Sequence, residues 1–334
     1  MSRHNDYYNA VLRMYDSRQL NNQRAYDLRK QEVYRCVPAL ESLDKQQVSE
    51  SVRRIKESIA SAHSKPDSAA FNLSASDYAA QRKKLLTEAG FPEDYLEMQY
   101  HCPLCKDTGY SNNQKCKCFK AAFINLLYGD SALRSALDTE NFDTFSYDYY
   151  ADDITDSLTG LTPYQNIQDA VAKAKNFIAD FDSSEGDCHN LLVCGNTGVG
   201  KTFLTNCIAR ELINAGYGVV YLSANELFTI LEDYKFRRNN SPDSETIHER
   251  HTAIHECDLL IIDDLGTELV NNFAITQLFH LLNNRQLQRH STIISTNLSM
   301  QHIKETYSER IFSRIASSYD YIRLFGEDIR LKKL

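Results

Sequence analysis

Apolar residues follow two different patterns along this chain. In residues 41–60, ESLDKQQVSESVRRIKESIA, they recur mostly three or four positions apart, as on one face of a helix. After about residue 160 they stand instead in short continuous runs separated by segments of helical period. The second pattern predicts strands that alternate with helices, which gives a parallel sheet covered on both faces.

The amino-terminal half is predicted to be mostly helical, beginning with residues 1–60. The apolar residues of the helix face described above are Leu43, Val48, Val52, Ile55 and Ile59. That face either packs within its own domain or forms a docking surface for a partner. A further helix is predicted over Tyr78–Ala89, because Gly90 and Pro92 follow it.

Five apolar runs predict the strands of the second half. They are Leu191–Gly195, Val219–Ala224, Asp258–Asp264, Ser291–Asn297 and Tyr319–Phe325. The preceding segment ENFDTFSYDYYADDITDSLTG is acidic and lacks a helical period, so it predicts a linker. We therefore expect an amino-terminal domain over residues 1–135, a linker over 136–165 and an α/β domain over 166–334.

Composition narrows the class of protein. A chain of 334 residues is long enough for two domains that each bury a core. The net charge of -8 gives no overall attraction to nucleic acid, so any such contact must come from a local patch. The sequence has no apolar stretch that could span a bilayer and no secretory-signal layout at its start, which predicts a cytoplasmic protein without a membrane partner.

The first apolar run leads into GNTGVGKT, which has the spacing G-x-x-x-x-G-K-[ST]. Glycines at this spacing let successive backbone N–H groups face a phosphate, and the following helix adds the positive end of its dipole. Lys201 can reach the β and γ phosphates, and the Thr202 hydroxyl can bind Mg²⁺. The residues predicted to contact nucleotide here are Gly195, Asn196, Thr197, Gly198, Val199, Gly200, Lys201 and Thr202.

The run DLLIIDD ends in Asp263 and Asp264. A buried strand that ends there brings both carboxylates to the carboxyl edge of the sheet, where open α/β sheets bind ligands. We expect Asp263 to hold Mg²⁺ and Asp264 to orient or deprotonate the attacking water. The strand that carries both residues is expected to lie next to the strand that precedes GNTGVGKT. An acidic turn that closes a strand is the alternative reading of this segment alone.

Three more residues are predicted to act on the γ phosphate. STIISTN ends in Asn297, whose amide can hydrogen-bond that phosphate or the attacking water. ERIFSRI places Arg310 and Arg314 four positions apart on one helix face. An arginine from an adjacent subunit can neutralise charge that develops on the γ phosphate, whereas surface ion pairs are the alternative role.

The segment CPLCKDTGYSNNQKCKC contains C-x2-C and C-x-C, with ten residues between them. Thiolates from Cys102, Cys105, Cys116 and Cys118 can surround one tetrahedral Zn²⁺ and leave no position open for catalysis. His101 can replace one of them as a ligand. A redox pair and unrelated buried cysteines are the alternatives, although C-x-C is a poor spacing for a disulfide.

A short basic and aromatic stretch follows the second predicted strand. In ELFTILEDYKFRRNN, aromatic rings alternate with cations at Lys235, Phe236, Arg237 and Arg238. Rings can stack on unpaired bases while cations follow the phosphates, which is how single strands are bound without reading their sequence. A solvated helix end is the alternative.

In this order, GNTGVGKT, LLIIDDLG, STIISTN and ERIFSRI resemble the AAA+ ATPases of the DnaC/DnaI helicase-loader family, which includes the IstB-type transposition helpers. The resemblance covers Thr139–Leu334. It implies an α/β fold with a P-loop AAA+ three-layer parallel sheet and no helical lid domain after the last strand. A mostly helical amino-terminal domain with a zinc knuckle is expected to precede it.

The resemblance also assigns roles by motif. Lys201 and Thr202 correspond to Walker A, Asp263 and Asp264 to Walker B, Asn297 to sensor 1, and Arg314, with Arg310 second, to the arginine finger. Most AAA+ proteins have Glu at the position of Asp264, which implies slow hydrolysis here. Arg330, in the segment after the last predicted strand, is a candidate for a second nucleotide-sensing arginine.

The implied function is an ATPase, using ATP, Mg²⁺ and Zn²⁺, that loads a hexameric replicative helicase onto single-stranded DNA. The cysteine segment resembles the zinc-binding domain with which DnaI-type loaders grip the helicase, and the ATPase half is expected to form a homo-oligomer. An IstB-type transposition helper and a nucleotide-dependent adaptor with little turnover are the alternatives.

Overall fold

The computed structural model of the chain describes residues 3–60, 75–129, 131–181, 189–236 and 244–333. The chain divides into two compact units, one over Arg13–Ser111 and one that combines Met1–Leu12 with Asn112–Leu334. This division falls inside the predicted amino-terminal domain, 1–135, rather than at its end. None of the described helices is both long enough and apolar enough to cross a membrane.

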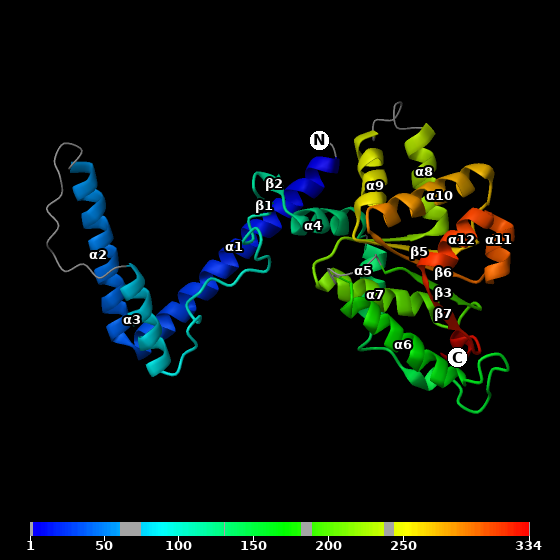
Figure 1. Ribbon diagram of the computed structural model, residues 1–334, viewed down its shortest axis with the longest axis horizontal. Coiled ribbons are helices and arrows are strands. Elements are labelled where there is room, and N and C mark those ends of the chain that lie inside the picture. Colours follow the sequence, from blue (N-terminus) through cyan, green and yellow to red (C-terminus); the bar gives the residue numbers. More distant parts are fainter. Residues whose placement is uncertain (1–2, 61–74, 130, 182–188, 237–243, 334) are drawn as a thin grey trace. The chain divides into compact units, whose positions relative to one another are not determined.

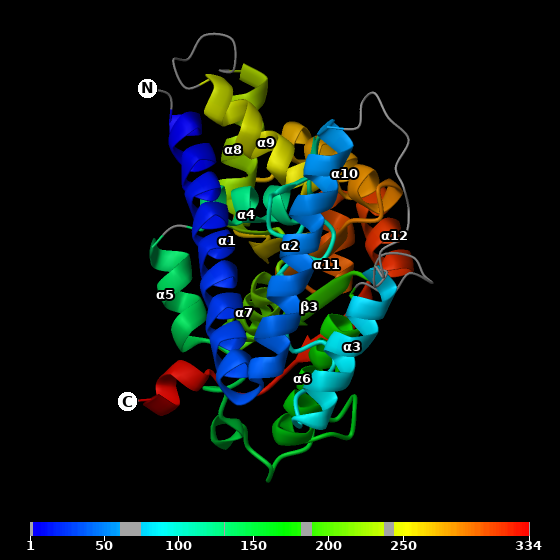
Figure 2. The ribbon, with the colours of Figure 1, turned by 90° about the vertical axis from the view of Figure 1, so that its left-hand side faces the viewer.

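Helices dominate the unit over Arg13–Ser111, as the apolar pattern predicts. They are α1 (Arg3–Cys36), α2 (Pro38–Ala60) and α3 (Ala75–Glu88). Figures 1 and 2 both show α2 and α3 side by side. The small core that joins these helices contains Val33, Leu40, Leu86 and Leu96.

The apolar face of α2 does not pack along its whole length. Leu43 is buried, but Val48 and Val52 remain 64% and 46% exposed. The side chains of Ile55 and Ile59 lie outside the described residues. Leu43 therefore belongs to the core of this unit, whereas Val48 and Val52 face solvent.

The second unit is built on a five-stranded sheet. Its strands are β3 (Leu191–Gly195), β4 (Val219–Ser223), β5 (Leu259–Leu265), β6 (Ser291–Thr296) and β7 (Asp320–Leu324). All neighbouring strands are parallel, in the order β4-β5-β6-β3-β7. The five predicted strands and the parallel sheet are thus confirmed.

Helices cover both faces of this sheet, because successive residues of a buried strand point to opposite sides. Leu191 and Val193 pack with α5, α6 and α7, and Leu192 and Cys194 pack with α4 and with α8 to α12 (Figure 1). The helix bounds are α4 (Lys117–Tyr128), α5 (Ser131–Thr139), α6 (Pro163–Ala179), α7 (Lys201–Asn214), α8 (Ala224–Phe236), α9 (Ser244–Glu256), α10 (Asn272–Leu287), α11 (Met300–Tyr307) and α12 (Glu309–Ser318).

The strand order corrects one expectation. Asp263 and Asp264 lie on β5, which is not next to β3, because β6 is inserted between the two strands. The pairing of β5 with β6 is irregular between Ile262 and Leu265. The two acidic residues occupy this irregular segment, where the chain departs from regular ladder pairing.

Aromatic residues of the predicted linker, 136–165, pack against the α/β unit. Phe145, Tyr147 and Tyr150 pack against the core that lies beneath β3, and η1 (Tyr147–Tyr149) forms among them. A capping box of Thr162 and Gln165 then begins α6. The segment lacks helical period because its aromatic side chains fill gaps along the core, a tertiary role that periodicity does not report.

Candidate functional site

The loop between β3 and α7 has the backbone that its glycines predict. Gly198 and Gly200 have φ values of 81° and 96°, which only glycine adopts without strain. A Cβ on Gly198 would lie 2.0 Å from the Asp328 carboxylate. Gly200 caps α7 without a side-chain hydrogen bond, so no side chain competes with an anion for the first N–H groups of that helix.

Lys201 is buried at the start of α7. Its ammonium donates to the carbonyl oxygens of Gly195 and Asn196, each at 2.9 Å. Burial lowers the pKa of Lys201, and the charges of Asp264 and Asp263 oppose that effect. A buried ammonium therefore stands between the glycine loop and the acidic pair.

Asp263 of β5 is hydrogen-bonded to both α7 and β6. Its Oδ2 accepts a hydrogen bond of 3.1 Å from the Thr202 hydroxyl, and its Oδ1 accepts one from the Ser295 hydroxyl on β6. Neighbouring oxygen ligands of octahedral Mg²⁺ stand about 2.9 Å apart, since each bond is about 2.0–2.1 Å. The Thr202 and Asp263 oxygens thus fit two adjacent positions around such an ion.

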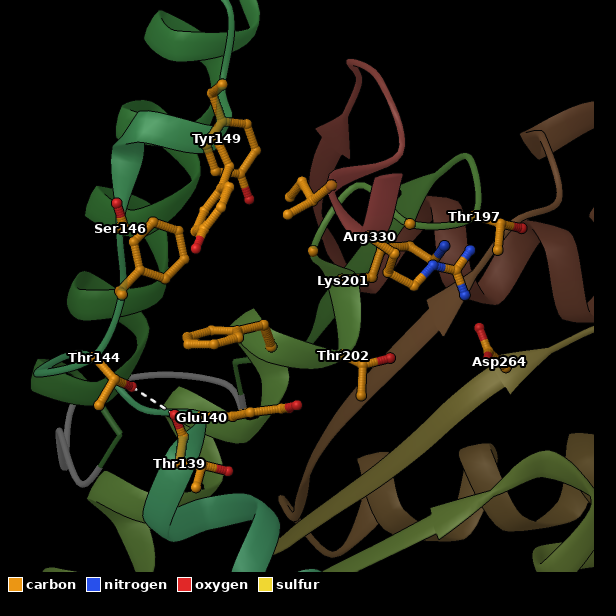
Figure 3. A pocket seen from close by; sticks show the side chains of 16 residues that line it. Thr139, Glu140, Thr144, Ser146, Tyr149, Thr197, Lys201, Thr202, Asp264 and Arg330 are labelled. Atoms are coloured by element: carbon orange, nitrogen blue, oxygen red, sulfur yellow. Dashed lines mark hydrogen bonds between the residues drawn. The ribbon is translucent and has the colours of Figure 1, made fainter. Parts of the chain in front are cut away.

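Asp264 has a φ of 53°, in the left-handed region that aspartate tolerates better than most residues. Its backbone N–H donates to Ser295 Oγ at 2.9 Å, which fixes this conformation. Desolvation and the charge of Asp263 raise the pKa of Asp264, while Lys201 and Arg330 oppose the rise. Its carboxylate faces the same cavity as Lys201 and Thr202 (Figure 3).

That cavity has a volume of about 430 Å³. Its lining includes five residues of the predicted phosphate loop and helix start, namely Thr197, Gly198, Gly200, Lys201 and Thr202. A second set comes from the predicted linker and was missed: Thr139, Glu140, Thr144, Phe145, Ser146, Tyr149 and Tyr150. The density of aromatic residues in ENFDTFSYDYY, just before the α/β domain, is the signal that could have indicated them.

Aromatic rings form one wall of the cavity. Phe145 and Tyr150 are nearly parallel, with ring centroids 6.3 Å apart, and Phe145 meets Phe203 of α7 edge-on. The Tyr150 hydroxyl donates to the Val199 carbonyl oxygen at 3.3 Å. This wall is therefore attached directly to the phosphate loop.

The segment after β7 also reaches the cavity. The Ile329 N–H donates to the Gly198 carbonyl oxygen at 2.9 Å, and Ile329 and Arg330 line the cavity. Arg330 pairs with Asp328 at 2.6 Å. Arg330, the candidate for a second nucleotide-sensing arginine, reaches the phosphate loop because β7 pairs with β3 and so brings the residues that follow β7 to this loop.

The structure does not bring every predicted residue to the cavity. Asn297 follows β6 directly and is exposed, but it is not among the described residues that line the cavity. Arg310 and Arg314 lie on α12. Arg314 donates to Gln286 Oε1 at 2.5 Å, whereas Arg310 is exposed and makes no hydrogen bond or ion pair within the described ranges.

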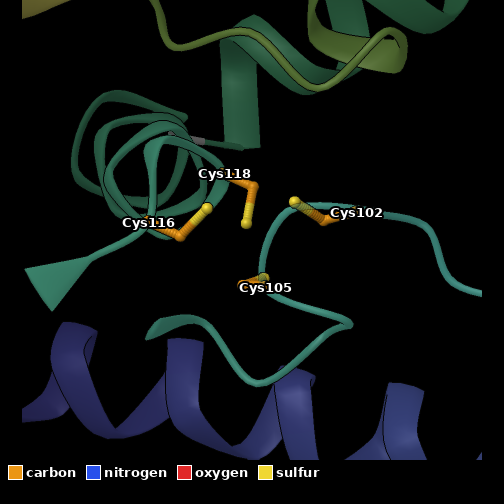
Figure 4. Close-up of side chains that lie close together, drawn as sticks. All are labelled: Cys102, Cys105, Cys116 and Cys118. Atoms are coloured by element: carbon orange, nitrogen blue, oxygen red, sulfur yellow. The ribbon is translucent and has the colours of Figure 1, made fainter. Parts of the chain in front are cut away.

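The four cysteines of CPLCKDTGYSNNQKCKC come together. The sulfur atoms of Cys102, Cys105, Cys116 and Cys118 all lie within 4.8 Å of one another and point inward (Figure 4). Tetrahedral Zn²⁺ with Zn–S bonds of about 2.3 Å needs sulfurs about 3.8 Å apart, so the cluster fits this ion. His101 is not part of the group.

Asp107 supports the first cysteine pair. It is fully buried, and its carboxylate accepts from the backbone N–H groups of His101 and Cys102, each at 2.9 Å, and from Asn22 at 2.7 Å. Burial alone would raise the pKa of Asp107, but these donors lower it. The charged carboxylate thus holds the turn that presents Cys102 and Cys105.

The predicted DNA-contacting stretch lies at the end of α8. Phe236 is 66% exposed, and the Lys235 ammonium stands 4.9 Å from the ring centroid of Phe273 on α10. Arg237 and Arg238 lie outside the described residues. Tyr234 stacks on His251 at 3.6 Å, so its ring already has a partner within the domain.

Comparison with known proteins identifies relatives of two kinds. The chain is 24% identical over 267 residues to the replicative helicase loader DnaI of Bacillus subtilis, covering 71% of this chain and 81% of that protein. It is 23% identical over 146 residues to the replicative helicase loader DnaC of Escherichia coli, covering 44% of this chain and 56% of that one. An insertion-sequence ATP-binding protein of Sinorhizobium fredii is 31% identical over 150 residues, which cover 43% of this chain and 58% of the relative.

Solved structures of DnaI and of the DnaC helicase loader are also similar, with TM-scores of 0.41 and 0.44 and identities of 27% and 18%. They cover 49% and 57% of this chain, and 85% and 98% of their own chains. Residues 164–333 match the family of IstB-like ATP binding proteins. This region is slightly more than half of the chain and contains Lys201, Asp263 and α12. The chain therefore belongs to the IstB-like ATP-binding protein family.

Proposed function

We propose that this protein is an ATPase that loads a hexameric replicative helicase onto single-stranded DNA. The observation that carries the ATPase part is that Lys201, Thr202 and Asp264 line one cavity, with Asp263 hydrogen-bonded to Thr202 directly behind it. The helicase part rests on the similarity to DnaI, which extends over 71% of the chain and hence beyond the ATPase family match.

The site residues have separate roles in the hydrolysis of ATP. Backbone N–H groups of the loop Gly195–Gly200 and the Lys201 ammonium bind the phosphates, and Thr202 and Asp263 hold Mg²⁺, which neutralises phosphate charge. Asp264 orients a water molecule and accepts its proton. The carboxylate of Asp264 is one methylene shorter than a glutamate, so turnover is expected to be slow.

The aromatic wall suits a nucleotide base. Phe145 and Tyr150 present ring faces next to the phosphate loop, and rings of this kind stack on bases. Thr139, Glu140 and Thr144 also line the cavity, on the side away from Thr197 (Figure 3). A nucleoside triphosphate can thus lie with its base on this wall and its phosphates at Lys201.

The arginines of α12 complete the site of a neighbouring subunit in a homo-oligomer. Arg310 is exposed and Arg314 is partly buried against Gln286 and Phe279. Arg314 must exchange its bond to Gln286 for a phosphate, whereas Arg310 has no such bond to a described residue. Asn297 acts from the tip of β6, and Arg330 approaches the phosphates from within its own chain.

Mixed assemblies test this arrangement. A Lys201→Ala chain keeps its arginines but lacks a working pocket, and an Arg310→Ala or Arg314→Ala chain keeps its pocket. Mixing the two should restore ATPase activity above that of either alone. Mixtures no more active than their components would rule out a site shared between subunits.

The amino-terminal unit is proposed to bind the helicase. The exposed apolar residues Val48 and Val52 offer a docking face, and zinc bound by the four cysteines holds the segment that follows this unit's helices. Single-stranded DNA is proposed to contact Lys235, Phe236, Arg237 and Arg238 in the ATPase half.

Co-purification with a hexameric replicative helicase tests the function as a whole. Binding should be lost on deletion of residues 1–111, which removes the helical unit but keeps α4 and α5 of the ATPase core. It should be weakened at least about tenfold by Val48→Asp with Val52→Asp, since a charge must then be buried in the interface. Gln46→Asp on the same helix adds a charge at another exposed position and should leave binding unchanged. Undiminished binding by the 1–111 deletion would refute the loader.

A transposition helper is the second candidate, because an insertion-sequence ATP-binding protein shares 31% identity over 150 residues. Binding to a transposase instead of a helicase would favour it. A nucleotide-dependent adaptor is the third, since Asp264 provides a short catalytic carboxylate. Tight ATP binding without turnover would favour the adaptor.

A further inference from the structure

Glu268 and Tyr307 form a buried pair that the phosphate chemistry does not require. Glu268 follows Asp264 by four residues and is 8% exposed, and Tyr307 is fully buried at the end of α11. Glu268 Oε2 accepts from the Gly266 backbone N–H at 2.9 Å, and Oε1 accepts from the Tyr307 hydroxyl. One carboxylate therefore bonds to two separate parts of the fold.

On one side, Glu268 fixes the loop that leaves the acidic pair. Gly266 has a φ of 108°, and a Cβ there would lie 2.7 Å from Leu298, so the loop sits tightly against the residues after β6. The Thr267 hydroxyl donates to the Asp264 carbonyl oxygen at 2.9 Å. The position of Asp264 is thus tied to the loop that Glu268 holds.

On the other side, Tyr307 stands at the junction of α11 and α12. Ser308, with a φ of 119°, separates the two helices, and Arg310 follows three residues after Tyr307. Ile303, Tyr307 and Ile311 are buried in the same core cluster. Tyr307 is thus connected to the start of α12 both through one intervening residue and through the shared core.

The hydroxyl of Tyr307 is protonated and donates a hydrogen bond to Glu268. A tyrosine hydroxyl is protonated at neutral pH, and burial and the hydrogen bond to Glu268 raise the pKa of Tyr307 further. A buried carboxylate oxygen needs such a donor, because burying it without one is costly.

We propose that Glu268 and Tyr307 are positioning residues that couple the loop of Asp264 to α12, so that nucleotide in one subunit changes how that subunit presents Arg310 and Arg314 to its neighbour. This inference rests on the proposed ATPase. It adds a route within one chain from the acidic pair to the arginines that act on the next chain's nucleotide.

Tyr307→Phe removes only the hydroxyl and is the first test. Tyr128→Phe is the matched control, because Tyr128 is also buried and donates a hydrogen bond, to the Arg250 carbonyl oxygen at 2.5 Å, away from the cavity. Hydrogen–deuterium exchange of the full chain is followed with and without Mg²⁺ and ATP. In the unmodified chain and in Tyr128→Phe, nucleotide should slow exchange both in the phosphate loop and over residues 307–314.

In Tyr307→Phe, nucleotide should still slow exchange in the phosphate loop but no longer over residues 307–314. Its kcat should fall by about fivefold or more, with KM for ATP within about twofold of the unmodified value, because the phosphate-binding contacts are untouched. A further Glu268→Gln change should cost little beyond the single variant, since the amide oxygen still accepts from Gly266 and no charge is left without its donor.

Two results would overturn the coupling. One is an unchanged nucleotide response over residues 307–314 in Tyr307→Phe, and the other is a Tyr128→Phe variant that loses the same response. Failure of the proposed ATPase looks different, because Mg²⁺ and ATP would then leave exchange in the phosphate loop of the unmodified chain unchanged. That outcome would remove the coupling as well.

Discussion

Ser295→Ala perturbs the site at a residue that contacts no ligand in the proposed reaction. Ser295 is fully buried on β6, where its hydroxyl donates to Asp263 Oδ1 and accepts from the Asp264 N–H at 2.9 Å. Alanine fits the same space but makes neither bond. The buried Asp263 oxygen and the Asp264 N–H are then left without this partner.

The expected effect on stability follows from these two bonds. A hydrogen bond to a charged group contributes about 1.5–3 kcal/mol, and an unmet buried N–H costs about 1–3 kcal/mol. Because Asp263 keeps its bond to Thr202, we expect the free energy of unfolding to fall by about 2–4 kcal/mol rather than by the full sum. The loss of the Asp264 bond should also weaken binding of Mg²⁺ and ATP by about tenfold, or about 1.4 kcal/mol.

Urea unfolding with and without Mg²⁺ and ATP measures both quantities. Saturating ligand should stabilise the Ser295→Ala chain by about 1.4 kcal/mol less than it stabilises the unmodified chain. Thr292→Val is the control, since it removes a buried β6 hydroxyl that accepts from Arg285 Nε at 3.1 Å, outside the site. It should lower stability without changing the stabilisation by ligand. Equal ligand stabilisation in the Ser295→Ala and unmodified chains would refute the reasoning.

Three further predictions concern other parts of the molecule. Because the pKa of Asp264 is raised, the ATPase rate should fall on acidification at a pH above the ordinary aspartate range of about 3.9; a pH–rate profile that stays level down to about pH 4 would contradict its role as a base. Arg285 is fully buried and donates to the carbonyl oxygens of Ile254, Cys257 and Ser291. Arg285→Met should therefore lower the free energy of unfolding, measured by chemical denaturation, by about 3 kcal/mol or more. A loss below about 1 kcal/mol would show that these hydrogen bonds contribute little to stability. Metal analysis should find one zinc per chain, lost in Cys116→Ser and retained in Cys36→Ser, whose thiol is exposed elsewhere; equal zinc in both variants would rule out the cluster as its ligand.

Contiguous features of the sequence determined much of this protein. Each strand was predicted from a short apolar run, and the phosphate loop from glycines and Lys201 within eight residues, GNTGVGKT. The cysteines were also predicted to meet, because C-x2-C and C-x-C lie within one short segment. Features of this kind depend on local backbone geometry and on side chains close in sequence, so the amino-acid sequence alone indicates them.

Tertiary structure decided what depends on residues far apart in the chain. Because β6 lies between β3 and β5, Ser295 is the hydrogen-bond partner of both acidic residues. Tertiary packing also places Phe145 and Tyr150 of the predicted linker in the lining of the cavity. The bond between Glu268 and Tyr307 spans 39 positions. No local propensity encodes such pairings, since they arise only when the strand order and the packing of the whole core bring distant segments to the same place.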